Sequence, residues 1–119
     1  MSDRILIAED NKNLCRILES ALSEAGYEVA VALGGDAAVH EIKSHPFDLV
    51  ISDIGLPDLS GYDLMTQLKA SYGSRGIALT GYGSREDISR SKAAGFMAHL
   101  TKPVESDALD AALEQFLTE

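Results

Sequence analysis

The sequence is poor in the features that tie a chain to a membrane or to an oxidising compartment. Its single cysteine, Cys15, cannot form an internal disulfide, so we expect a reducing compartment. No apolar run approaches the roughly 18 residues of a membrane-spanning helix, and the start MSDRILIAED lacks the apolar stretch of a signal peptide. We therefore expect a cytoplasmic chain without membrane insertion, either by itself or as a module of a larger, membrane-bound protein.

Positive charge is scarce as well. The chain has 10 Lys and Arg against 19 Asp and Glu, which gives a formal net charge of −9 at pH 7. Binding to nucleic-acid phosphates needs a basic face, so we expect no direct contact with nucleic acid. The 45% hydrophobic content is that of a folded protein, and 119 residues are enough for one compact domain, residues 1–119, but not for two.

What the chain does have is a regular alternation of two patterns. Short apolar runs rich in β-branched residues occur at 4–8, 28–33, 48–52, 76–80 and 97–101. Their near-continuous apolarity predicts strands covered on both faces, as in a parallel sheet. After each run, apolar residues recur at helical spacing, in stripes that begin with Leu14, Ala38, Leu64, Ile88 and Leu109.

Five strands alternating with five helices predict a doubly wound α/β fold. With right-handed crossovers, the chain forms a flavodoxin-like (βα)5 unit whose parallel sheet has the order 2-1-3-4-5. Ligands of such folds bind beyond the carboxyl ends of the strands, where the winding reverses. The residues that leave each strand are therefore the candidates for a functional site.

Polar residues leave four of the five predicted strands. Glu9 and Asp10 follow the first strand, Asp53 follows the third, Thr80 ends the fourth and Lys102 follows the fifth. Three carboxylates crowd together only with a compensating cation, and oxygen ligands on loops suit Mg²⁺ or Mn²⁺. An ammonium and a hydroxyl beside them stabilise developing phosphoryl charge. The set predicts metal-dependent phosphoryl transfer to Asp53.

Each of these signals is weak when it stands alone. An Asp at a strand end is usually a cap or turn residue, an acid pair is usually solvated, and Lys-Pro usually marks a loop. What favours a site is their joint placement, because four such signals end four different strands of a sheet that would bring them to one edge.

The segments that carry these residues resemble a known family. ILIAEDN, DLVISDIGLPDLSGYDL, IALTGYG and HLTKPV are similar to the receiver domains of two-component response regulators, over essentially the whole chain. They look most like the receivers of hybrid histidine kinases and of stand-alone regulators. The resemblance implies that Asp53 is the phosphoacceptor, and that a histidine kinase or histidine phosphotransfer domain donates the phosphoryl group.

The resemblance also implies roles for the other residues of the set. Glu9 and Asp10 would hold Mg²⁺ together with Asp53, and the backbone carbonyl of Gly55 would complete the protein's ligands. Lys102 would contact the phosphoryl oxygens.

Switching is a further expectation from the resemblance. Thr80 would move to hydrogen-bond the phosphoryl oxygens, and the surface over residues 80–102 would change. The peptide bond before Pro103 would be cis. The aspartyl phosphate would hydrolyse slowly by self-catalysis, so the chain would not be a conventional enzyme.

The sequence departs from the commonest pattern of the family at His99, where an aromatic switch residue is expected. Imidazole is smaller, polar and sensitive to pH, which puts the coupling of His99 to Thr80 in question. Two interpretations stay open: a switch residue, or a partly exposed strand histidine with no part in signalling. Gly55, Gly81 and Glu9 are ordinary variants of the pattern.

The first helix begins beside the acid pair. Its start, with Asn13, Leu14 and Ile17, and the loop at Pro103 should therefore face the incoming histidine domain.

The helix within 83–95 has a capping box in Ser84 and Asp87, but its apolar stripe consists only of Ile88 and alanines. We therefore expect this helix to be the most weakly held of the five.

Other functions fit less well. An aspartyl-phosphate phosphatase would carry a second Asp two residues after the nucleophile, where this chain has Gly55. A pseudo-receiver that only docks partners would lack the acid pair, the acceptor or the lysine. A flavodoxin-like carrier needs a phosphate-binding loop where Glu9 and Asp10 would repel FMN phosphate. The glycine patterns LGGD at 33–36 and GYG at 81–83 lack the spacing of a nucleotide-binding motif.

Overall fold

The computed structural model describes residues 3–81 and 85–117. Strands and helices alternate along them: β1 (Arg4–Ala8), α1 (Lys12–Glu24), β2 (Glu28–Ala32), α2 (Gly35–Ser44), β3 (Leu49–Asp53), α3 (Gly61–Tyr72), β4 (Gly76–Thr80), α4 (Arg85–Ala94), β5 (Ala98–Thr101) and α5 (Ser106–Leu117). The strands form one parallel sheet in the order β2-β1-β3-β4-β5, so the predicted fold is confirmed. No helix in the described ranges is long and apolar enough to span a bilayer.

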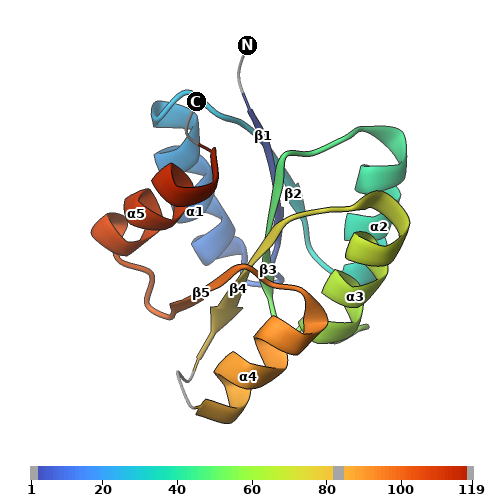
Figure 1. Ribbon diagram of the computed structural model, residues 1–119. Helices are drawn as coiled ribbons and strands as arrows, with labels where there is room; N and C mark the ends of the chain where they lie inside the picture. The colour runs from blue at the N-terminus through green and yellow to red at the C-terminus, as the bar shows by residue number, and fades with distance from the viewer. Residues whose placement is uncertain (1–2, 82–84, 118–119) are drawn as a thin grey trace.

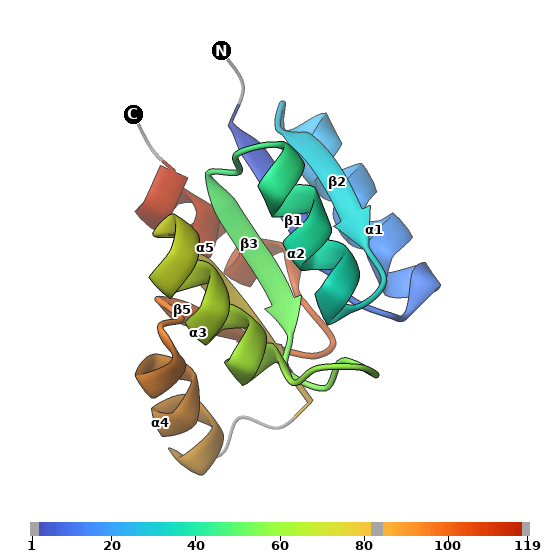
Figure 2. The same ribbon diagram turned by 90° about the vertical axis from the view of Figure 1, so that its right-hand side faces the viewer.

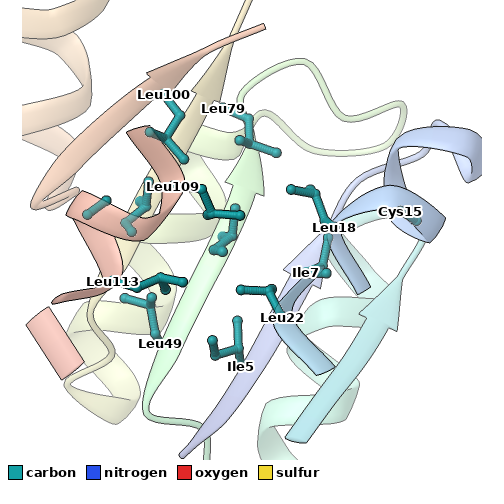
Figure 3. Packing of buried hydrophobic residues seen from close by; sticks show 13 residues of the cluster. Ile5, Ile7, Cys15, Leu18, Leu22, Leu49, Leu79, Leu100, Leu109 and Leu113 are labelled. Carbon is teal, nitrogen blue, oxygen red and sulfur yellow. The ribbon is translucent and has the colours of Figure 1, made fainter. Parts of the chain in front are cut away.

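The sheet lies between two layers of helices. Figures 1 and 2 show α1 and α5 on one face and α2 and α3 on the other, with α4 beside α3. Along β1, Ile5 and Ile7 pack toward α1 and α5, whereas Leu6 and Ala8 pack with α2 and α3. Figure 3 shows the first of these clusters, in which the strands meet Leu18 and Leu22 of α1 and Leu109 and Leu113 of α5. Burial on both faces explains why the strand sequences are almost continuously apolar.

The helix and strand ends agree closely with the sequence prediction. Gly26 follows the end of α1 with a φ of 99°, a left-handed conformation that glycine adopts without strain. Two predicted strands are one residue too long, since β2 ends at Ala32 and β5 begins at Ala98. Strand β3 lies one residue later than predicted, with Asp53 as its last residue. The predicted capping box of α4 includes Ser84, which lies outside the described residues.

The strand register brings the carboxyl ends of β3, β4 and β5 level with one another. Asp53 at the end of β3 pairs with Leu79, and Thr80 at the end of β4 pairs with Thr101 at the end of β5. Glu9 directly follows β1, which pairs with β3 on the side away from β4. The polar residues that leave the strands therefore gather along one edge.

Gly61 lets α3 begin directly against the end of β3. A Cβ atom on Gly61 would overlap the backbone carbonyl oxygen of Asp53 and lie 2.5 Å from the Cα atom of Ile54. The Gly61 N–H donates a hydrogen bond to the Ile54 carbonyl at 2.9 Å, and the Ser60 side chain accepts one from the Asp63 N–H at 3.1 Å. The loop between β3 and α3 is therefore closed tightly, and its position relative to Asp53 is fixed.

Candidate functional site

Three carboxylates meet at the carboxyl edge of the sheet. Glu9, Asp10 and Asp53 each bring one oxygen within 4.8 Å of the others. Asp10 is exposed, whereas Glu9 and Asp53 are only 1% and 8% exposed. Ionised carboxylates at such distances repel one another, and three oxygen donors from two adjacent strand ends suit a hard divalent cation. The donor set therefore fits Mg²⁺, as the sequence predicts.

Lys102 bridges two of these carboxylates. Its Nζ atom lies 2.8 Å from Oε1 of Glu9 and 3.3 Å from Oδ2 of Asp53, and its side chain is 29% exposed. The Lys102 N–H donates to the Thr80 carbonyl at 2.7 Å, which fixes the point at which the lysine leaves the sheet. The peptide bond from Lys102 to Pro103 is cis. An ammonium is thus held between the buried acid and the proposed acceptor.

The charges of Glu9 and Lys102 depend on each other. Burial raises the pKa of Glu9 above its ordinary value, although hydrogen bonds from Lys102 and from the Asn11 N–H oppose this shift. Burial lowers the pKa of Lys102, but the hydrogen bond to Glu9 and the charge of Asp53 outweigh it, so the pKa is raised. The protonated lysine therefore favours the ionised form of a carboxyl that burial alone would protonate.

The Asp53 side chain is held in one orientation by its own loop. The Gly55 N–H donates to Oδ1 at 3.1 Å, which leaves Oδ2 toward Lys102. The Ser52 hydroxyl donates to the backbone carbonyl of Asp53 at 2.9 Å. A Cβ on Gly55 would have Oδ1 of Asp53, at 3.9 Å, as its nearest neighbour among the described atoms, so this side of the carboxylate is open.

Contacts that the sequence did not predict support Glu9. The thiol of Cys15 donates to the Glu9 carbonyl at 3.2 Å, and the Asn11 N–H donates to Oε2 at 3.0 Å. The Glu9 N–H donates to the Ala32 carbonyl of β2 at 3.0 Å. Burial raises the pKa of the Cys15 thiol, so the thiol form that donates this bond is favoured. Sequence reasoning gave Cys15 no part in the site, because no spacing pattern links it to Glu9.

Thr80 and His99 lie on the same face of the sheet. His99 pairs with Ala78, and directly paired residues of parallel strands point to one face, as do residues two apart on a strand. The Thr80 hydroxyl is buried and has no hydrogen-bond partner in the part of the chain that the structure describes. His99 is partly buried and lines a surface pocket of about 440 Å³ together with Lys102 and Pro103. Among the described residues, Thr80 is therefore a donor without an acceptor near the acidic edge.

The start of α1 carries an exposed apolar side chain. Ile17 is 65% exposed, and Asn13 is also exposed. Leu14 is half-buried against the core, so it belongs in part to the packing of α1. Of the predicted docking residues, Ile17 is the one whose exposure needs an explanation beyond packing.

The chain is similar to many known proteins. Residues 5–114 match the family model of the response regulator receiver domain. The transcriptional regulatory protein ZraR of Escherichia coli K12 is 32% identical over 114 residues, a match that covers 95% of this chain and 26% of ZraR. The virulence sensor protein BvgS of Bordetella pertussis is 32% identical over 123 residues, which cover 97% of this chain and 10% of BvgS. The chain thus spans about a quarter or less of the length of these two relatives.

Solved structures show the same likeness. A putative response regulator from Chloroflexus aurantiacus superposes with a TM-score of 0.94 at 28% identity, with all of both chains covered. The chemotaxis response regulator CheY4 of Vibrio cholerae gives a TM-score of 0.93 at 27% identity, covering 98% of this chain and 100% of the other.

The mutual dependence of Glu9 and Lys102 predicts a pH-dependent loss of stability in Lys102→Met. Without the ammonium, burial raises the Glu9 pKa further, and a carboxyl whose pKa is raised on folding loses stability as the pH rises through that value. We expect the variant to resemble the wild type below the ordinary Glu pKa of 4.5 and to be less stable by about 1–3 kcal/mol near neutral pH. Urea unfolding at both pH values measures the difference.

Lys92→Met, at an exposed position of α4, is the matched control and should change stability little at either pH. An equal loss at both pH values in Lys102→Met would show that the lysine contributes packing rather than charge.

Proposed function

The chain belongs to the response regulator receiver domain family, and on that premise we propose that it is a phosphorylated switch whose acceptor is Asp53. A receiver domain is the component of two-component systems that receives the signal, and the donor we propose is the phosphohistidine of a histidine kinase or of a histidine phosphotransfer domain. The observation that carries the proposal is the ammonium of Lys102 between Glu9 and Asp53, with Asp10 beside them.

Phosphoryl transfer would follow from the geometry of the acceptor. The Asp53 carboxylate attacks phosphorus in line with the departing imidazole of the partner. The Gly55 N–H at Oδ1 holds the nucleophile in position before the donor arrives, which lowers the entropic cost of the encounter. Lys102 then pairs with the phosphoryl oxygens. Glu9, Asp10, Asp53 and the Gly55 carbonyl would hold Mg²⁺, which would neutralise charge on the phosphoryl oxygens.

We propose that Thr80 transmits the change. Its buried hydroxyl lacks an acceptor among the described residues, and a phosphoryl group on Asp53 would provide one. A shift of Thr80 toward that group would pull the start of α4 toward the site. Of residues 88–94 only Ser91 is buried, so this part of α4 buries little apolar surface, and we propose that α4 is the helix whose position changes on phosphorylation. We propose that His99 on β5, on the same face of the sheet as Thr80, takes the position of the family's usual switch residue.

Hydrolysis of the aspartyl phosphate by water would reset the switch. The same groups that stabilise transfer stabilise this second displacement, which returns Asp53 and releases inorganic phosphate. The chain thus catalyses reactions of its own phosphoryl group and does not turn over a separate substrate.

The partners we propose are proteins. A net charge of −9 disfavours contact with nucleic-acid phosphates, and the donor proposed above is a protein domain. We propose that residues 1–119 form one receiver unit in the cytoplasm and that this unit is part of a larger hybrid kinase; the match to 10% of the length of the virulence sensor protein BvgS supports a place within a larger sensor protein. Cell fractionation that recovers the unit outside the cytoplasm would contradict this placement.

Chemical labelling tests the acceptor. Incubation with Mg²⁺ and acetyl phosphate should add one phosphoryl group, detected by intact mass. Asp53→Asn should abolish the adduct because an amide is not a nucleophile, and Asp10→Asn should slow labelling by about tenfold or more because a metal ligand is lost. Asp63→Asn, at an exposed position of α3, is the control and should label normally. Undiminished labelling of Asp53→Asn would refute the assignment.

Introducing a negative charge at the apolar positions of α1 tests the docking face. Ile17→Asp should slow transfer from the cognate phosphohistidine domain by about tenfold, since a buried apolar contact is lost, while labelling by acetyl phosphate stays unchanged. Leu14→Asp should act in the same way if circular dichroism shows that it folds. Tyr72→Asp, at the opposite edge of the sheet and 44% exposed, is the control. Normal transfer to both α1 variants would place the docking surface elsewhere.

Amide hydrogen exchange tests the switch. Beryllofluoride, which mimics the phosphoryl group, should change exchange chiefly over residues 80–102 and less in α1 and α2, apart from the loop that follows β1. Asp53→Asn should show no response. The aromatic residue that the family usually has at position 99 would give a larger change in exchange, so His99→Tyr should enlarge the change caused by beryllofluoride. Identical exchange over 80–102 with and without the mimic would make the chain a phosphoryl relay rather than a switch.

A further inference from the structure

The amino end of α2 is capped by a residue from a distant loop. Gly34, the cap residue, has no side chain that could accept a hydrogen bond from the first turn. Asp58, in the loop between β3 and α3, accepts one instead from the Gly35 N–H at 2.8 Å and another from the Asp36 N–H at 3.0 Å. Two of the N–H groups that a helix start leaves unpaired are therefore satisfied by one carboxylate 23 residues beyond Gly35.

The two glycines of the LGGD pattern make room for this contact. A Cβ on Gly34 would lie 3.1 Å from Oδ1 of Asp58, and a Cβ on Gly35 would lie 2.7 Å from Cβ of Leu59. The backbone of Gly34 is extended, with a φ of −164°, which any residue adopts. Close approach, rather than backbone conformation, is thus the reason for glycine here. We call the contact of Asp58 and Leu59 with Gly34 and Gly35 the α2 anchor.

The anchor holds a charged group in place. Hydrogen bonds from the N–H groups of Asp36 and Gly35 lower the pKa of Asp58, so its carboxylate is ionised at neutral pH. The amino end of a helix carries partial positive charge, which favours an anion at this position. Leu59 adds an apolar contact, since it packs against the core cluster between the sheet and α2 and α3.

The anchored loop is the one that carries Gly55. Its first residue is fixed by the bond from the Ile54 N–H to the Leu79 carbonyl at 3.2 Å, and Leu56 is buried. Gly55 lies between these two points and is exposed. Because glycine has no side chain to pack, its backbone carbonyl depends on the flanking residues for its position. Asp58 and Leu59 fix the distal side of the loop to α2.

We propose that Asp58 is a positioning residue for the metal site: the α2 anchor holds the loop so that the Gly55 carbonyl already faces Asp10 and Asp53 when a divalent cation arrives. This inference rests on the proposed function of the site. A preformed ligand set binds more tightly because less ordering is needed on binding. Loss of the anchor therefore weakens metal binding but leaves the chemistry of the metal-bound site intact.

A magnesium titration of the ¹⁵N-labelled chain, followed by amide NMR shifts, tests the anchor without reference to activity. Asp58→Ala should raise the dissociation constant by about tenfold, the lower end of what loss of an outer partner costs a metal site. Asp58→Asn should have a smaller effect, because its one carbonyl oxygen accepts one of the two bonds. At saturating Mg²⁺, Asp58→Ala should label with acetyl phosphate within about twofold of the wild-type rate.

The matched control is Asp48→Ala. Asp48 accepts a bond from the Arg4 N–H at 2.7 Å, so this variant loses the same kind of contact at the opposite edge of the sheet. It should leave the dissociation constant unchanged. Gly35→Ala breaks the anchor from the other side, and it should raise the constant as Asp58→Ala does. The double variant Gly35→Ala/Asp58→Ala should bind Mg²⁺ no more weakly than the weaker-binding of the two single variants, because both changes disrupt the same contact.

The outcomes separate the inference from the proposed function. A wild-type chain that binds no Mg²⁺, or an Asp53→Asn variant that still labels, contradicts the function itself. Wild-type binding together with an unchanged constant in Asp58→Ala overturns the anchor alone. An equal rise in Asp48→Ala and Asp58→Ala also overturns it, because the effect would then report general destabilisation.

Discussion

Electrostatic repulsion among Glu9, Asp10 and Asp53 is the constraint around which this edge of the molecule is organised. Two unit charges about 4 Å apart at an effective dielectric constant near 20 interact by about 4 kcal/mol, a large share of the 5–15 kcal/mol that typically separates a folded domain from its unfolded chain. Lys102 offsets part of this repulsion within the chain itself. A bound cation offsets more, which makes affinity for a divalent metal a direct product of the crowding.

The rest of the fold keeps these groups from moving apart. The level strand ends fix the backbone positions of Asp53, Thr80 and Lys102, and apolar side chains on both faces of the sheet maintain the strand register. The close approach of Gly61 to the Asp53 backbone holds the acceptor from the other side. Repulsion at the edge is thus balanced by packing well away from it, and the site can relax by binding a cation more easily than by spreading.

Sequence alone predicted the parts of this arrangement that depend on local pattern. The strands were recognisable because burial on two faces leaves them almost wholly apolar, and the site followed because parallel strands share one carboxyl edge. The thiol of Cys15 beneath Glu9 and the bond of Asp58 to α2 were not predicted. These contacts join segments that no periodicity relates. From the sequence, the LGGD pattern that contains Gly34 and Gly35 could only be excluded as a nucleotide-binding motif, because it lacks the spacing of one.

The Thr80 hydroxyl, which has no hydrogen-bond partner in residues 3–81 and 85–117, limits how strongly a phosphoryl group can act through it. A buried polar group without a partner costs about 1–3 kcal/mol, and this is the free energy that one new acceptor could recover. Moving an equilibrium from 1:99 to 99:1 needs about 5.5 kcal/mol. A response carried by Thr80 alone would thus be graded, with both conformations populated before and after phosphorylation, and the signal would be read as a proportion of molecules rather than as presence or absence.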